Sequence, residues 1–211
     1  VYECLQIAKS HDQIFCSAGI HPHDAKAAPA DYIEKIYELM NDKSMIAIGE
    51  IGLDYFRNIS GKEIQKRCFK EQLSIAQKIS KPVIIHNRNS DKDMIKVLLE
   101  FPEVIGVAHC FSSDLEMANK FLDIGYYISF SGNLTFKNSH LPMVAKELPL
   151  DRILVETDSP FLSPEPFRGK SNEPGRVRYV AEKLAEIYSM SFEKIAEITS
   201  NNASKLFNLN D

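Results

Sequence analysis

The sequence lacks the features that mark membrane, secreted and disordered proteins. Among its 211 residues, no apolar run approaches the roughly 18 to 20 residues that cross a bilayer, and Val1 to Ser10 do not have the charged-then-apolar pattern of a signal peptide. Hydrophobic residues make up 44% of the chain, which is enough to bury one substantial core. We therefore predict a folded cytoplasmic protein without a membrane partner.

Cysteines are few, and basic residues do not exceed acidic ones. The four cysteines are widely spaced and form no CxxC pair, which argues against a zinc ribbon and against a disulfide framework. The net charge of −4 provides no broad basic surface for electrostatic capture of nucleic acid. Any recognition of phosphate must therefore be local.

Short apolar runs alternate with helical segments, which is typical of parallel βαβ units. The expected strands are Ile14 to Ile20, Met45 to Ile51, Pro82 to His86, Val104 to His109, Tyr126 to Phe130 and Ile153 to Glu156. The expected helices are Asp31 to Asn41, Gly61 to Ile79, Asp91 to Phe101, Asp114 to Asp123, His140 to Glu147 and Arg176 to Asn208. Six such units fit an open doubly wound sheet, or an eight-stranded barrel without two of its units. The sequence has no GxGxxG or GxxxxGK[ST] motif, which we would expect of the doubly wound alternative.

One domain over residues 1–211 is the economical interpretation, because no repeat, linker or compositional break divides the chain. The segment from Ser159 to Gly175 contains four prolines and has no clear periodicity. Long irregular loops in compact domains tend to be functional.

Four residues with metal-binding side chains follow apolar strands. They are Glu50, His86, His109 and Asp158, and each is expected to end its strand. In a parallel barrel all strand carboxyl ends open on the same face, so these residues would converge on one site. Taken singly, a histidine here is more often a satisfied hydrogen-bonding residue, and a carboxylate could cap a helix or pair within a loop. Four such coincidences at equivalent places favour a site for a divalent ion.

A second polar cluster, GIHPHD at residues 19–24, carries His21 and His23. It fits a ligand, a supporting partner or a contact to substrate phosphate, and it equally fits a rigid turn whose Asp24 caps the next helix. Positively charged side chains lie in the same predicted loops, and arginine matches phosphate oxygens well. The candidate substrate-binding residues are His23, Arg57, Arg88, Arg168 and Arg176.

Taken together, the motifs resemble the TatD family of metal-dependent hydrolases. The matching segments are GIHPHDAK (19–26), AIGEIGLDYFR (47–57), KPVIIHNR (81–88), GVAHCFS (106–112), YYISFSGNLTFKN (126–138), DRILVETDSPFL (151–162) and RGKSNEP (168–174). They occur in the family's order over nearly the whole chain. The resemblance is therefore far more specific than any single motif.

The resemblance implies a TIM-type (β/α)8 barrel that binds one or two divalent ions, which would be zinc, manganese or magnesium. It implies Glu50 as a bridging carboxylate and His86, His109 and Asp158 as further metal ligands. It also places Glu50, His21 and Asp158 at the reaction centre, where Asp158 would orient or deprotonate water. The implied activity is hydrolysis of DNA phosphodiester bonds, on single-stranded DNA or at strand ends.

The start of the sequence differs from the family's pattern, in which a first strand carries an HxH motif. We therefore expect that the first two β/α units are absent from this chain and that two-metal catalysis is weakened. Two alternatives remain open at this point. One is a hydrolase of the same fold that acts on an amide, an ester or a small phosphodiester. The other is an inactive metal-binding module.

Overall fold

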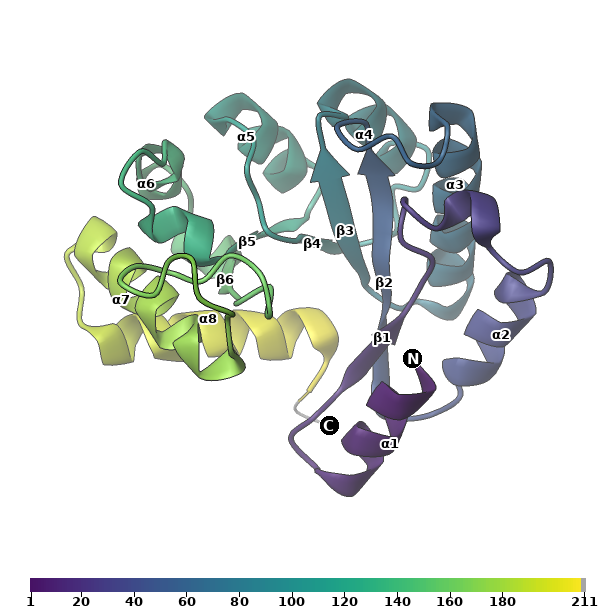
Figure 1. Ribbon diagram of the computed structural model, residues 1–211, viewed down its shortest axis with the longest axis horizontal. Coiled ribbons are helices and arrows are strands. Elements are labelled where there is room, and N and C mark those ends of the chain that lie inside the picture. Colours follow the sequence, from purple (N-terminus) through teal and green to yellow (C-terminus); the bar gives the residue numbers. More distant parts are fainter. Residues whose placement is uncertain (210–211) are drawn as a thin grey trace. The chain divides into compact units, whose positions relative to one another are not determined.

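The computed structural model describes residues 1–209, which divide into two compact units (Figure 1). The first unit comprises residues 1–107, and the second begins at Ala108. The single domain expected over residues 1–211 stays a prediction, and its last two residues lie outside the described part of the chain.

The chain forms an α/β fold with a six-stranded sheet whose strands follow the chain order. The strands are β1 (Cys16–Ala18), β2 (Met45–Asp54), β3 (Val83–Arg88), β4 (Gly106–Ala108), β5 (Tyr127–Phe130) and β6 (Ile153–Val155). The α-helices are α1 (Tyr2–Ser10), α2 (Tyr32–Leu39), α3 (Lys62–Ile79), α4 (Asp91–Leu98), α5 (Leu115–Asp123), α6 (Leu141–Lys146), α7 (Val177–Tyr188) and α8 (Phe192–Phe207). Four short 3-10 helices are η1 (Ala25–Ala27), η2 (Gly132–Thr135), η3 (Leu150–Arg152) and η4 (Pro174–Arg176). The predicted α/β class with parallel strand pairing is thereby confirmed.

The first unit is built on β1, β2 and β3, which pair in parallel. The inward side chains of β2, from Met45 to Leu53, are fully buried, and α3 packs its apolar face against this strand. Helix α3 ends where Ser80 adopts a left-handed conformation, two residues before Pro82, as expected for a helix stopped before a proline. This arrangement fixes the carboxyl ends of β2 and β3 side by side.

In the second unit, β5 pairs in parallel with β6 and its four residues are all buried. Two helices of this unit have capped starts, because Asp114 accepts a hydrogen bond from Met117 N–H and Ser191 accepts one from Lys194 N–H. The helical region expected from Arg176 to Asn208 is divided into α7 and α8, because Ser189 adopts a left-handed conformation.

Two strands extend beyond the ends predicted for them. Glu50 was expected to end its strand, but β2 continues to Asp54, and His86 lies inside β3, which continues to Arg88. The reason is that residues 52–54 remain paired with residues 86–88, while Ile51 and Leu53 stay fully buried. Glu50 and His86 therefore have strand backbone on both sides.

Within the described residues, no helix has both the length and the apolar character that crossing a membrane requires.

Candidate metal centre

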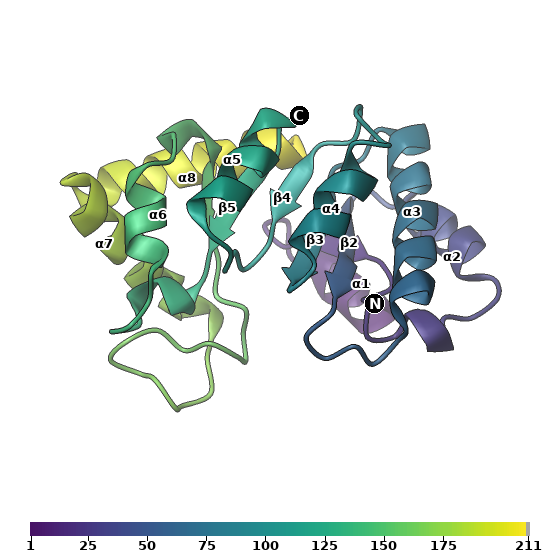
Figure 2. The ribbon, with the colours of Figure 1, turned by 90° about the horizontal axis from the view of Figure 1, so that it is seen from above.

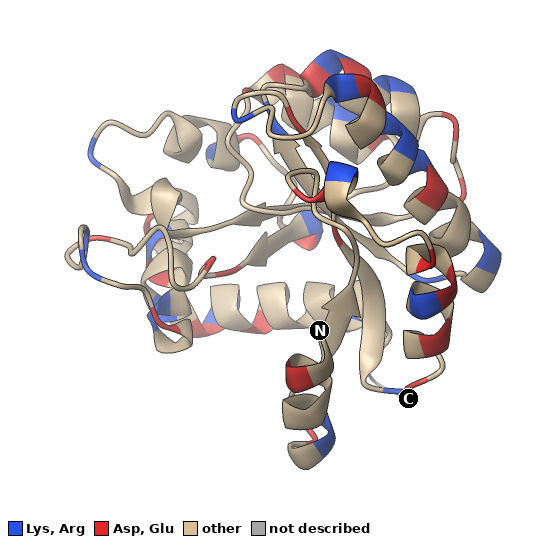
Figure 3. Cartoon of the chain, turned by 45° about the vertical axis from the view of Figure 1, so that its right-hand side comes forward, with Lys and Arg blue, Asp and Glu red and all other residues tan. Residues whose placement is uncertain are grey.

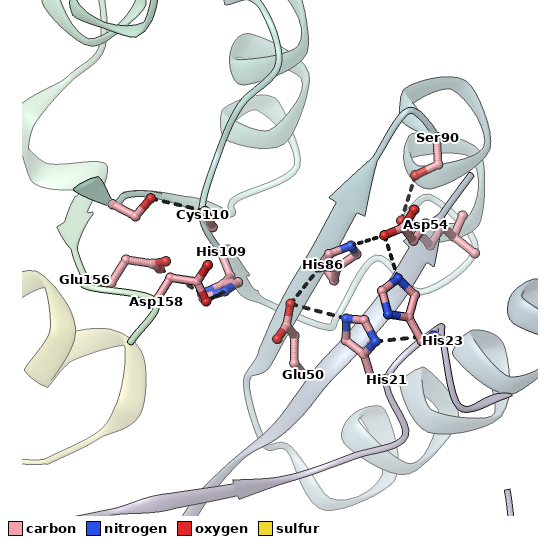
Figure 4. A network of polar contacts seen from close by, with 12 residues as sticks. His21, His23, Glu50, Asp54, His86, Ser90, His109, Cys110, Glu156 and Asp158 are labelled. Atoms are coloured by element: carbon pink, nitrogen blue, oxygen red, sulfur yellow. Dashed lines mark hydrogen bonds and ion pairs between the residues drawn. The ribbon is translucent and has the colours of Figure 1, made fainter. Parts of the chain in front are cut away.

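Glu50 and His86 face each other from adjacent strands of the first unit (Figure 4). The Nδ1 atom of His86 lies 2.7 Å from Glu50 Oε1, and the Nε2 atom of His21 lies 3.8 Å from the same oxygen. One ligand atom from each of these three residues lies within 4.8 Å of the others, which is close enough for the group to hold a metal ion. Imidazole and carboxylate donors together suit zinc or manganese, so the residues present fit a divalent ion.

Gly52 allows β2 and β3 to approach closely at this point. Its φ of 141° is rarely adopted by residues with a side chain, and an added Cβ would lie 2.0 Å from the carbonyl oxygen of His86. Gly52 is also paired with His86 in the sheet register. A glycine at this position therefore keeps the backbone of His86 against the strand that carries Glu50.

Asp54 contacts the rings of two histidines, His23 and His86. Its Oδ2 accepts hydrogen bonds from His23 Nε2 at 2.8 Å and from His86 Nε2 at 3.1 Å, and its side chain is fully buried. Burial alone would raise the pKa of Asp54, but the hydrogen bonds from the Arg57 backbone N–H and from the two histidines hold that pKa below its usual range. Asp54 is therefore a carboxylate that fixes the orientation of both rings.

His21 is held as a neutral ring. Burial is the main cause that lowers its pKa to about 4, and the nearby Glu50 only partly opposes it. The backbone N–H of His23 donates to His21 Nδ1 at 3.2 Å, so the single ring proton of neutral His21 is on Nε2. The alternative role of this segment as a capping turn is not supported, because Asp24 makes no side-chain hydrogen bond to the start of η1. His21 thus presents an N–H donor toward Glu50.

The second unit contains its own cluster, made by His109, Glu156 and Asp158 (Figure 4). Glu156 Oε2 lies 2.9 Å from His109 Nδ1, and Asp158 Oδ1 lies 3.6 Å from His109 Nε2. The other oxygen of Glu156 is buried and has no hydrogen-bond partner among the described residues. Both Asp158 and Cys110 adopt left-handed backbone conformations, with φ of 57° and 46°. Such costly conformations concentrate at functional sites.

The structure thus brings Glu50 together with His86 in the first unit, and His109 together with Asp158 in the second. That all four residues form one site stays a prediction. His21 and His23 accompany the first pair, and Glu156 accompanies the second.

The four candidate arginines have different surroundings. Arg57 is exposed, Arg88 stacks over the Phe56 ring at 4.1 Å, and Arg168 stacks over the Phe136 ring at 3.9 Å. Arg176 is mostly buried, and its Nη1 donates to Ser163 Oγ and to the carbonyl oxygen of Ser171. Arg176 therefore holds the loop before α7, while the other three arginines leave their guanidinium groups more open.

Comparison with known proteins places this arrangement in a family. The model of the family described as TatD related DNase matches residues 1–208. The chain belongs to the TatD family. YabD of Bacillus subtilis (strain 168), an uncharacterized metal-dependent hydrolase, is 43% identical over 213 residues, which cover 100% of this chain and 84% of that protein.

Two further TatD relatives are similar over nearly the whole chain. The 3'-5' ssDNA/RNA exonuclease TatD of Pectobacterium parmentieri (strain WPP163) is 33% identical, over 99% of this chain and 84% of its own length. The crystal structure of YjjV, a TatD homolog from Escherichia coli K12, superposes with a TM-score of 0.92 at 29% identity, covering 98% of this chain and 82% of that chain. The chain is therefore a metal-dependent hydrolase of the TatD family, which confirms the prediction that it is an enzyme.

Proposed function

We propose that this TatD protein hydrolyses phosphodiester bonds of DNA and acts on single strands or strand ends. The observation that carries the proposal is the pairing of Glu50 with His86, whose opposite ring nitrogen is held by the buried Asp54. A histidine fixed between two carboxylates in this way is typical of a metal ligand. The name of the Pectobacterium relative, a 3'-5' ssDNA/RNA exonuclease, supports the substrate class.

Glu50 and His86 would hold the divalent ion, with His109 and Asp158 as the further ligands that the family resemblance implies. If Asp54 accepts a hydrogen bond from the Nε2–H of His86, the lone pair of Nδ1 is directed toward Glu50. The chemistry that a divalent ion would supply there, when bound, is polarisation of a phosphoryl oxygen and activation of water as a nucleophile. Zinc, manganese and magnesium are the candidate ions, and the imidazole ligands favour the first two.

The protein's own side chains would complete the reaction. His21 would donate its Nε2 proton in a hydrogen bond to a phosphate oxygen, because its Nδ1 is occupied by the backbone N–H of His23. This role agrees with its low pKa, since a neutral ring keeps one donor and adds no positive charge beside a bound cation. Asp158 would orient or deprotonate the attacking water, and Arg57 and Arg88 would contact substrate phosphates.

The barrel form of the fold is also part of this proposal. A (β/α)8 barrel would require two β/α units in addition to the six described here, and the expectation that they carry an HxH motif stays a prediction. So does the cytoplasmic location. Analysis of the metal bound to this chain would test the expectation that two-metal binding is weakened: two tightly bound ions per chain would contradict that expectation.

An activity panel tests the proposed function. We expect the purified protein, loaded with manganese or zinc, to shorten single-stranded DNA labelled at one end and to leave it intact in EDTA. Duplex DNA, RNA, an ester and an amide are tested separately as alternative substrates. Cleavage of the ester or amide without cleavage of any nucleic acid would contradict the proposal.

Two histidine variants distinguish the loss of a metal ligand from a general loss of folding. His86→Asn removes a candidate ligand, so we expect activity to fall about a hundredfold or more, equivalent to about 3 kcal/mol of lost transition-state stabilisation. His11→Asn changes an exposed histidine of the same unit and should leave activity unchanged. Equal activity of the two variants would contradict the proposal that His86 is a metal ligand.

A further inference from the structure

The second unit contains a cleft whose lining combines polar side chains with an aromatic ring. Its volume is about 320 Å³, which is within the size range of small-ligand sites. The residues that line it include Ser112, Asn133, Phe136, Asn138, His140 and Arg168. No carboxylate is among the described residues that line the cleft.

The charge of this cleft is unbalanced. Arg168 lies over the Phe136 ring at 3.9 Å, and no carboxylate of the described residues lies within ion-pair distance of its guanidinium group. A cleft of similar size between α3 and α4 differs in this respect, because Lys66 and Lys70 in it are paired with Glu63 and Glu100. Acidic and basic residues are interspersed along those helices (Figure 3). The cleft at Arg168 therefore attracts an anion, and the cleft between α3 and α4 is electrically balanced.

The loop that carries Arg168 is fixed over Phe136 by specific contacts. This loop connects β6 to α7 and is the long green loop at the bottom of Figure 2. Its Glu165 N–H donates to Thr135 Oγ1 at 2.9 Å, one residue before Phe136. Gly132 lies so close to the loop that an added Cβ would be 1.9 Å from the carbonyl oxygen of Leu162. These contacts hold Arg168 in position over Phe136.

The cleft adjoins the cluster around His109. Asn133 donates from Nδ2 to the carbonyl oxygen of Phe111 at 3.4 Å, and Ser131 Oγ lies 3.0 Å from Asn133 Oδ1 and 3.1 Å from Cys110 Sγ. Cys110 directly follows His109 in the sequence. A ligand in the cleft would therefore lie beside the segment that presents His109.

We infer that this cleft binds one unpaired nucleotide of a DNA strand, with its base stacked on the Phe136–Arg168 pair and its phosphate bound by Arg168. An aromatic ring combined with a cation is the usual means by which proteins bind single-stranded nucleic acid without sequence preference. The side chains of Ser112 and Asn138 supply donors and acceptors for the edge of any base. The inference rests on the proposed function and adds to it a subsite for the strand.

Binding to metal-free protein tests the inference separately from catalysis. The probes are a fluorescent oligothymidylate and an abasic strand of the same length, measured by anisotropy in EDTA. We expect Phe136→Ala to weaken binding of the oligothymidylate about tenfold and binding of the abasic strand much less, because only a base can stack. Phe136→Tyr should restore the preference for a base.

The salt dependence of binding tests the contact between Arg168 and phosphate. Arg168→Gln should weaken the binding of both probes, and it should reduce the slope of log affinity against log salt by about 0.7, as expected for one lost phosphate contact on a single strand. Arg168→Lys should keep that slope. Since Arg168 is exposed, these variants should fold even if Phe136→Ala does not.

Arg178 and Phe192 provide a matched control. Arg178 also lies over a phenylalanine ring, at 5.2 Å, but it is paired with Glu182, and neither residue lines the cleft. Phe192→Ala and Arg178→Gln should bind both probes like the unmodified protein. If the variants of Phe136 and Arg168 bind both probes like these controls while the unmodified protein cleaves DNA, the inference that the cleft binds a nucleotide is overturned. The proposed function then stands. If the unmodified protein neither binds nor cleaves DNA, both are overturned.

Discussion

Asp54 and His86 are in contact on the side of the imidazole ring that faces away from Glu50, where Asp54 Oδ2 lies 3.1 Å from His86 Nε2. This contact determines which ring nitrogen keeps a lone pair for a cation. Asp54 thereby acts on metal binding through His86, as a positioning residue.

Asp54→Asn is expected to weaken metal binding about 10- to 100-fold, the range found when the partner of a metal-binding histidine is changed. The side-chain amide that this substitution introduces would offer a donor to His86 Nε2 and so favour a proton on Nδ1, the atom that faces Glu50. Competition titration with a zinc-sensitive dye measures the affinity. Asp93→Asn is a matched control, because Asp93 bonds to Tyr55 and makes no contact with the histidines. Equal affinities of the two variants would exclude the positioning role.

The alternation of apolar runs and helical segments predicted the order of the strands and helices, because burial on a parallel sheet requires such runs. It did not predict where β2 and β3 end, since the pairing of residues 52–54 with residues 86–88 depends on contacts distant in sequence. Predicted ligands such as Glu50 and His86 were found by their place after apolar residues, and the structure puts them together.

The supporting carboxylates were missed for a related reason. Asp54 lies four residues after Glu50 in the same strand, and Glu156 lies two residues before Asp158. Residues separated by four positions in a strand share a face, so the spacing of Glu50 and Asp54 was a usable signal, whereas Glu156 and Asp158 both lie after the end of β6. Their actual roles depend on which histidine reaches them, and that follows only from strand register and the buried environment.

Glu156→Gln is expected to change the tautomer of His109. Glu156 Oε2 lies 2.9 Å from His109 Nδ1, and a carboxylate at that distance favours the tautomer with its proton on Nδ1 and the lone pair of Nε2 toward Asp158. A glutamine amide can turn either its oxygen or its nitrogen to the ring, so we expect a mixture of tautomers, visible in the ¹⁵N shifts of His109. Glu147→Gln, at an exposed carboxylate of the same unit, should leave those shifts unchanged. A single unchanged tautomer in Glu156→Gln would show that other contacts orient the ring.

The stability of the metal-free protein should depend on pH through His21. Its pKa is lowered to about 4 in the folded protein, mainly by burial, while in the unfolded chain it stays near 6.5. Between these values the unfolded state binds one more proton, so the free energy of unfolding falls as pH decreases from 6.5 toward 4. His21→Asn should make urea unfolding less dependent on pH in this window. His11→Asn serves as an exposed control, and an identical pH dependence in both variants would contradict the effect.

Gly132→Ala is expected to destabilise the second unit and to move the loop that carries Arg168. An added Cβ would lie 1.9 Å from the carbonyl oxygen of Leu162, so one of the two segments must shift, at a cost of about 1–3 kcal/mol. Because Glu165 is bonded to Thr135 in the same contact, Arg168 should lose its place over Phe136, and affinity for single-stranded DNA should fall together with the melting temperature. Gly175→Ala is the matched control, because no heavy atom of the described residues beyond its chain neighbours lies within 4 Å of its added Cβ. If Gly132→Ala melts and binds DNA like Gly175→Ala, the segments at Gly132 and Leu162 can separate without loss, and the contact does not fix the loop.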